Sequence, residues 1–254
     1  MNPFPAENSL LNSDPYNSST HIFKKMNRNF LIITLLAFSL ISSCLQKPEE
    51  TLAIGVLLTV PEAIYQQSIK LNRAILENHP DNITLNEQHI PHITLLHCYV
   101  QESDLSEIEQ VLNGFYKTIE HDSLWADELQ YSKAKTESFA SIGIKRSRSL
   151  MALHENVIAL LEPYILAEGS QQAYVQNVGG TPIDDFTLAY VPKFVSAHSY
   201  DNYNPHISLG VANTAILDSL AQHHFRATKF KAKAIGIYQL GAFGTAQKRI
   251  WESE

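Results

Sequence analysis

The hydrophobic and polar positions after residue 50 predict an alternation of strands and helices. The run TLAIGVLLTV at 51–60 is almost continuously apolar and rich in β-branched side chains, which is typical of a buried strand. After Pro61 the apolar residues recur at helical spacing as far as NHPDN at 78–82, so a helix is expected between them. The segment HITLLHCYV at 92–100 has the composition of a second strand.

The elements that follow this second strand recur later in the chain. The pattern predicts a strand, a helix, two strands and a long helix, and then again a strand, a helix and two strands. In order, these segments are 92–100, 103–120, 128–135, 137–145, 149–168, 206–212, 214–225, 229–241 and 247–252. The recurrence predicts a duplicated α+β fold in which each copy forms an antiparallel sheet with helices on one face.

Both copies begin with one motif, PHIT in the first and PHIS in the second. Alternate side chains of a strand share a face, so His92 and Thr94 are expected on one face, as are His206 and Ser208. The intervening Ile and Leu would then face the core. Two such strands set face to face would enclose a cleft that holds two imidazoles and two hydroxyls.

Paired imidazoles suit in-line displacement at phosphorus. Their ordinary pKa of about 6.5 lets one act as a general base and the other as a general acid near neutral pH. The base would take a proton from the attacking water or hydroxyl, and the acid would protonate the departing oxygen. The hydroxyls would hydrogen-bond the non-bridging oxygens as charge builds up. This scheme requires neither a metal ion nor a cofactor.

The two motifs, His92-Ile93-Thr94 and His206-Ile207-Ser208, resemble the paired His-x-Thr/Ser motifs of the two-histidine (2H) phosphoesterase superfamily, which includes 2'-5' RNA ligase-like proteins and cyclic phosphodiesterases. The resemblance implies an α+β, bilobal duplicated fold over 51–254, with two antiparallel sheets facing a central cleft and helices on the outer faces. It implies that the two histidines are catalytic and that Thr94 and Ser208 bind phosphate. By family analogy His206 is the base and His92 the acid, with the reverse assignment open.

The function implied by this resemblance is a metal-independent phosphodiesterase that opens 2',3'-cyclic nucleotides or short oligonucleotide ends. The 19 Lys and Arg against 26 Asp and Glu give a net charge of −7 and no basic footprint for a duplex or a long RNA. We therefore expect a monomer that acts on a small nucleotide or oligonucleotide phosphoester. Tyr203, just before the second motif, could stack on a base or could pack within its loop.

The amino-terminal part has the pattern of an export signal. In MNRNFLIITLLAFSLISSC at 26–44, Arg28 precedes an apolar run that is shorter than the roughly 20 residues needed to span a bilayer. ISSC resembles the bacterial lipobox, which implies that Cys44 is lipidated. The expected organisation is a polar leader or over-extended start, a signal peptide, a lipidated cysteine with its tether, and the 2H domain, at 1–25, 26–43, 44–50 and 51–254.

This organisation implies an exported lipoprotein anchored in a membrane on its periplasmic face. Leu45 follows the cysteine, in place of the aspartate that holds many Gram-negative lipoproteins at the inner membrane. The outer membrane is therefore preferred.

Two other functions fit parts of the sequence. An exported lipoprotein could bind a nucleotide or phosphate without turnover, or a zinc-binding lipoprotein could use His89, His92 and His97. Against zinc, His92 and His97 are an odd number of residues apart and would face opposite sides of a regular strand. By the same alternation Cys98 would share the face of His92, although a buried apolar environment is commoner for such a cysteine. His89 and His97 have no counterpart in the second copy and are expected to be structural or surface residues.

Overall fold

The computed structural model describes residues 49–119 and 121–253. The predicted leader, the predicted signal peptide and Cys44, the predicted lipidation site, lie outside the described residues, and so does most of the predicted tether. The described residues belong to one compact unit, Pro48–Glu254.

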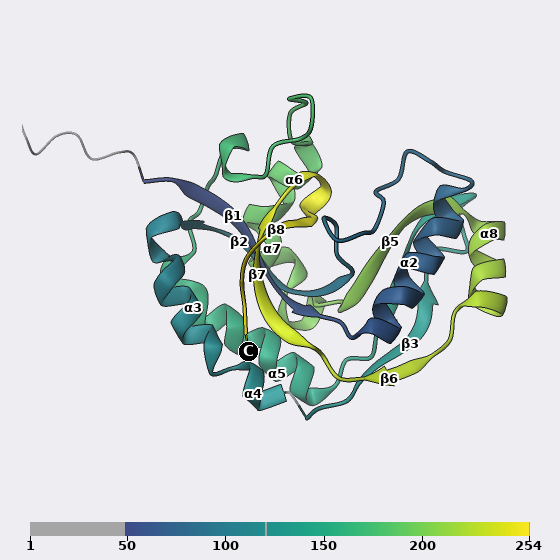
Figure 1. The fold of residues 1–254 in the computed structure, drawn as a ribbon, viewed down its shortest axis with the longest axis horizontal. Coiled ribbons are helices and arrows are strands. Elements are labelled where there is room, and N and C mark those ends of the chain that lie inside the picture. The colour runs from purple at the N-terminus through teal and green to yellow at the C-terminus, as the bar shows by residue number, and fades with distance from the viewer. Residues whose placement is uncertain (1–48, 120, 254) are drawn as a thin grey trace, which may run out of the picture. The chain divides into compact units, whose positions relative to one another are not determined.

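Most elements follow the order expected from the sequence, but the helix expected at 103–120 and the strand expected at 229–241 each divide into two, and short helical turns lie between the elements (Figure 1). The strands are β1 (Thr51–Thr59), β2 (His92–Gln101), β3 (Leu124–Gln130), β4 (Glu137–Ile144), β5 (His206–Asn213), β6 (Thr228–Phe230), β7 (Ala234–Leu240) and β8 (Ala246–Glu252). The helices are α2 (Glu62–Leu76), α3 (Leu105–Asn113), α4 (Tyr116–Ile119), α5 (Arg148–Leu161), α6 (Asp185–Tyr190), α7 (Phe194–His198) and α8 (Thr214–Ser219).

The described strands form two four-stranded sheets, in the orders β2-β1-β7-β8 and β5-β4-β3-β6. Every pairing is antiparallel. The α+β fold with two antiparallel sheets is therefore confirmed. The motif strands β2 and β5 take an edge of each sheet, and they contact one another.

The two sheets do not each contain one sequence copy, which corrects the expected division. Strands β3 and β4 follow the first motif along the chain but join the sheet of the second motif strand. Strands β7 and β8 follow the second motif but join the sheet of the first. Hydrophobic alternation specifies which face of a strand is buried and leaves its partner unspecified. This exchange ties the two halves together, since each sheet needs strands from both copies.

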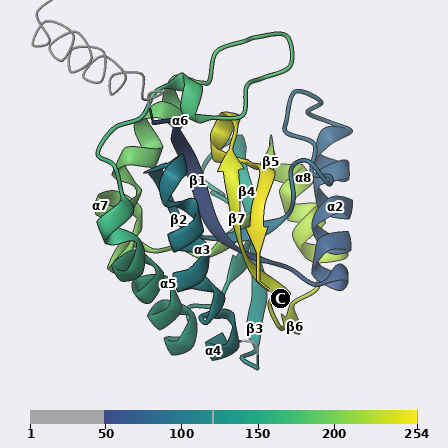
Figure 2. The same ribbon diagram turned by 60° about the vertical axis from the view of Figure 1, so that its left-hand side comes forward.

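Helices cover the sheets on different sides (Figure 2). Helix α5 packs on β2 and contacts α3 and α4, while α2 and α8 pack on β5. Apolar side chains of both sheets and of these helices form one continuous core. None of the helices in the described part of the chain is long and apolar enough to cross a membrane.

Candidate active site

Each motif strand carries a β-bulge directly after its His-x-Thr/Ser motif. Where β2 pairs with β1, the neighbouring β1 residues Val56 and Leu57 pair with Leu96 and Thr94 of β2. Leu95 is therefore an extra residue in β2. The register between β4 and β5 shifts in the same way and leaves Leu209 as the extra residue. A bulge inserts one residue into one strand and so reverses the alternation of faces beyond it.

The first bulge corrects the expected orientation of His97 and Cys98. Because the alternation reverses at Leu95, His97 lies on the face of His92 and lines the same cleft. Cys98 turns to the opposite face and is buried in the core, which confirms its reading as a small buried hydrophobe. Burial raises the pKa of the Cys98 thiol to about 12, so the thiol stays protonated at neutral pH.

A cleft of about 760 Å³ brings the two motifs together. The motif residues His92, Thr94, His206 and Ser208 all line it, as the repeated motif predicts. Both histidines are partly exposed, so a ligand can reach them. The cleft is large enough for a nucleotide-sized ligand.

The two motif histidines are held in the same way. Nδ1 of His92 lies 2.7 Å from the carbonyl oxygen of Ile90, and Nδ1 of His206 lies 2.7 Å from that of Asn204. Since a carbonyl can only accept, Nδ1 carries the proton in both neutral rings. Nε2 is therefore the nitrogen left to accept or deliver a proton. A proline stands between the histidine and its carbonyl partner in both motifs, which favours an extended backbone before it.

Burial keeps both imidazoles neutral when the cleft is empty. The pKa of His92 is lowered to about 4, mainly by burial and also by the nearby charge of His206, while its bond to the Ile90 carbonyl acts in the opposite direction. Burial also lowers the pKa of His206. An anion between the rings would favour their charged forms and raise both pKa values. An imidazole that is neutral in the empty cleft would therefore gain a proton more readily as an anion binds.

Each bulge is held by a buried polar side chain that sequence patterns did not reveal. Nδ1 of His154, on α5, donates to the carbonyl of Leu95 at 2.7 Å. Nδ2 of Asn72, on α2, donates to the carbonyl of Leu209 at 2.8 Å. Both side chains are almost fully buried. The two extra residues of the bulges would otherwise leave buried carbonyls without a partner.

Tyr203 lines the cleft, but its ring packs inward, which favours the loop-packing alternative over stacking on a base. Its ring is 3 % exposed and stacks on the imidazole of His154, with the centroids 3.8 Å apart. Its hydroxyl donates to the backbone carbonyl of Thr94 at 2.7 Å. Tyr203 thus links α5 to the first motif strand and has little surface left for a base.

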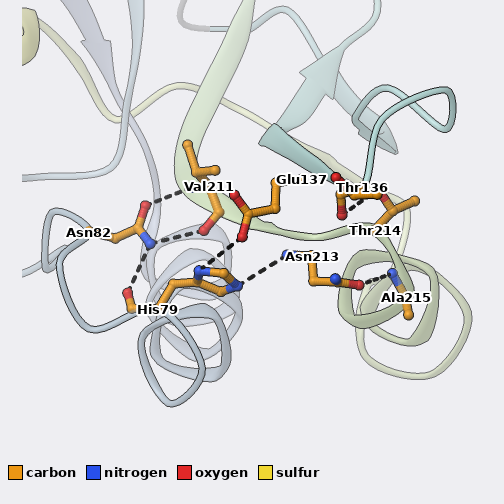
Figure 3. A network of polar contacts seen from close by, with 8 residues as sticks. All are labelled: His79, Asn82, Thr136, Glu137, Val211, Asn213, Thr214 and Ala215. Atoms are coloured by element: carbon orange, nitrogen blue, oxygen red, sulfur yellow. Dashed lines mark hydrogen bonds and ion pairs between the residues drawn. The ribbon is translucent and has the colours of Figure 1, made fainter.

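The loop between α2 and β2 forms one wall of the cleft and is tied to the free edge of β5 (Figure 3). The Asn82 amide donates to the carbonyl of Val211 at 2.9 Å, and its oxygen accepts from the Val211 N–H at 2.6 Å. Nε2 of His79 accepts from the N–H of Asn213 at 3.2 Å. Gly210 allows this approach, because its φ is +128° and a Cβ there would lie 2.8 Å from the Asn82 oxygen.

Exposed aromatic rings line the cleft around the histidines. Phe139, Phe186 and Phe243 are 49 %, 64 % and 61 % exposed. Phe243 has a left-handed backbone, with φ 57°, and its N–H donates to Asp184 at 2.8 Å. A bulky residue in this conformation is uncommon and is found more often at functional sites. The sequence pattern did not single out these rings.

Among the described residues that line the cleft there is no Lys or Arg, and the single carboxylate is that of Asp81. Charge on a bound phosphate would therefore be met by hydroxyls, imidazoles and backbone groups. His89, His92 and His97 all line the cleft, as a zinc site would need. However, no group of three His, Cys, Asp or Glu within the described ranges is placed to hold a metal ion.

Comparison with known proteins identifies the family. The structure of Usb1 from Kluyveromyces marxianus is similar with a TM-score of 0.36 and 14% identity, over 75% of this chain and 94% of that chain. The structure of the same protein with uridine monophosphate gives a TM-score of 0.33 and 15% identity, over 73% and 94%. No curated protein matches the sequence. A family model, described as the 2'-5' RNA ligase superfamily, matches residues 61–240, so the chain belongs to the 2'-5' RNA ligase superfamily.

Proposed function

We propose that the protein is a phosphodiesterase that opens 2',3'-cyclic nucleotides or short oligonucleotide ends by paired-histidine acid–base catalysis without a metal ion. One observation carries this proposal. Two imidazoles line a single cleft, each has Nδ1 fixed by a carbonyl two residues earlier, and each is followed by a hydroxyl residue that lines the same cleft.

The reaction uses the free nitrogens of both rings. Nε2 of one histidine, assigned to His206 by family analogy, takes a proton from water as the water oxygen forms a bond to phosphorus. Nε2 of His92 delivers a proton to the ribose oxygen as its bond to phosphorus breaks. A cyclic diester and water thus become a nucleoside monophosphate. The Thr94 and Ser208 hydroxyls hydrogen-bond the non-bridging oxygens, whose negative charge grows in the transition state.

The protonation states favour reaction only when substrate is bound. With the cleft empty, both rings are neutral at pH 7, because burial lowers both pKa values. A phosphate anion between them raises the pKa of the imidazole that becomes the acid. The absence of Lys and Arg among the described lining residues makes the imidazolium the main positive charge available to the substrate.

A nucleotide fits the other features of the cleft. The exposed rings of Phe139, Phe186 and Phe243 offer surfaces on which a base can stack. The net charge of −7 disfavours a long polyanion. These features support a mononucleotide or a short oligonucleotide as the ligand.

The test compares the full chain with His92→Ala and His206→Ala on 2',3'-cyclic nucleotides in excess chelator. We expect turnover by the parent and a loss of at least about a hundredfold in either variant. His223→Ala is the matched control, since His223 is exposed and does not line the cleft. Turnover that needs a metal ion, or that survives in either cleft variant, would contradict the mechanism. Saturable nucleotide binding without turnover would instead favour a binding protein.

The same protein is proposed to act outside the cytoplasm, anchored by lipid on Cys44. The support is the sequence pattern of 26–44. Expression with radiolabelled palmitate, followed by membrane fractionation, tests this. Cys44→Ser should abolish both labelling and membrane retention, and label retained by that variant would refute the anchor.

A further inference from the structure

His97 is a buried imidazole in the cleft wall that the proposed reaction does not use. It is 4 % exposed and lines the cleft with the motif residues. Neither ring nitrogen has a hydrogen-bond partner within the described part of the chain. Buried polar groups in native proteins nearly always have a partner, so a pair of unpartnered nitrogens requires an explanation.

The surroundings of His97 fit its ring but supply no partner. Tyr190 and Phe194 pack against it, with ring centroids 5.8 Å and 5.2 Å away. Glycines stand on two other sides, because a Cβ on Gly55 would lie 3.3 Å from Nε2, and one on Gly244 would lie 3.7 Å from Nδ1. Aromatic carbon and glycine backbone cover this imidazole, and both nitrogens have almost no accessible surface, so a partner from the cleft reaches one of them only when the neighbouring rings shift slightly.

The second copy has no such group. Val211 occupies the position of β5 that His97 occupies in β2, five residues after the motif histidine and past the bulge. Both residues line the cleft. An N–H donor is therefore present on the His92 side of the cleft, while the corresponding place on the His206 side is apolar.

We propose that His97 is a third substrate-binding imidazole, which hydrogen-bonds a non-bridging phosphate oxygen on the His92 side, directly or through one ordered water. This inference rests on the proposed function, since it takes a phosphate ester as the ligand. A donor is needed there because the described lining residues include no Lys or Arg.

The protonation state suits a neutral donor. Burial, together with the charges of His92, His206 and His198, lowers the pKa of His97 to about 3. The ring therefore stays neutral at pH 7 and offers one N–H and one acceptor nitrogen. It supplies a hydrogen bond without competing with the two motif histidines as an acid or base.

The experiment replaces His97 in the full chain by Phe, which keeps a flat ring and removes both nitrogens, and by Gln, which keeps a donor. Inorganic phosphate is the probe for binding, measured by calorimetry, and a 2',3'-cyclic nucleotide is the probe for turnover. For His97→Phe we expect phosphate affinity to fall about tenfold and kcat/KM to fall about ten- to a hundredfold. Its Tm should equal or exceed that of the parent, because an unpartnered polar group has been removed. His97→Gln should recover part of both losses, and His223→Phe is the control for the same change outside the cleft.

The outcomes separate this inference from the proposed function. Parent-like phosphate affinity and parent-like kcat/KM in His97→Phe would overturn the inference while the function stands. A lowered Tm with equal losses in the Phe and Gln variants would also overturn it, since the residue would then be structural. If the parent binds phosphate without turnover and His97→Phe weakens that binding, the inference stands and the proposed function fails. A folded parent that binds no phosphate overturns the inference.

Discussion

The bulge in β5 depends on one buried amide, and Asn72→Ala measures its contribution. Nδ2 of Asn72 donates to the carbonyls of Leu209 and Ile83 at 2.8 and 2.9 Å, and its oxygen accepts from the N–H of Leu85 at 2.9 Å. The side chain is 1 % exposed. Three hydrogen bonds at about 1 kcal/mol each give an expected loss of about 3 kcal/mol in the free energy of unfolding.

The assay is urea unfolding at pH 7.5, with Asn78→Ala as the control. Asn78 lies just after helix α2, where the loop to β2 begins. It is exposed, and its amide makes a local hydrogen bond to the Ala74 carbonyl. The midpoint for Asn72→Ala should fall with an unchanged m value. Because the loop from α2 leads to Ile90, whose carbonyl holds His92, kcat should fall as well. A loss below 1 kcal/mol, or one equal to that of Asn78→Ala, would refute the reasoning.

Three further predictions concern the same cleft. The free energy of unfolding should fall from pH 7.5 to pH 5. Burial lowers the pKa values of His92, His154 and His206 in the folded protein below the unfolded value of about 6.5. As the pH falls, the unfolded chain therefore binds protons first and is stabilised relative to the folded protein. Urea unfolding across this range checks it, with the slope expected to flatten in His154→Gln; a rise in stability toward pH 5 would contradict it. Gly210→Ala should lower the free energy of unfolding by about 1–3 kcal/mol, which is more than Gly179→Ala should. Both glycines have positive φ, but only at Gly210 would a Cβ lie against Asn82. Equal losses in urea unfolding would show that the clash with Asn82 does not contribute. Phe243→Gly should raise Tm by relieving left-handed strain and should raise KM for a cyclic nucleotide, and an unchanged KM would exclude the ring from binding.

The motif could be placed from sequence because it lies before the irregular part of each strand. Alternation correctly put His92 with Thr94, and His206 with Ser208, on the cleft side. Beyond the bulge at Leu95 the same rule gave the wrong face for His97. A bulge is stabilised by distant side chains, so a local pattern cannot reveal it.

The fold class followed from the order of elements, whereas the strand pairing did not. The segment 229–241 was expected to be one strand, but it divides between β6 in one sheet and β7 in the other. Its apolar and polar residues alternate from Lys229 to Ala234, across the division, whereas β7 is buried along its whole length. Partner choice depends on contacts between residues far apart in sequence. Those contacts also decide that Tyr203 packs on His154.

The two halves of the cleft are alike in everything that the motif encodes. Both histidines bond a carbonyl two residues earlier, and both motifs end at a bulge held by a buried side chain. Equivalent bonding gives neither ring a built-in role as acid or base. The halves differ instead at His97 and Val211, one a hydrogen-bonding group and the other apolar. In the proposed reaction the ester would orient itself against these unlike residues, which would then decide which histidine faces the departing oxygen and acts as the acid.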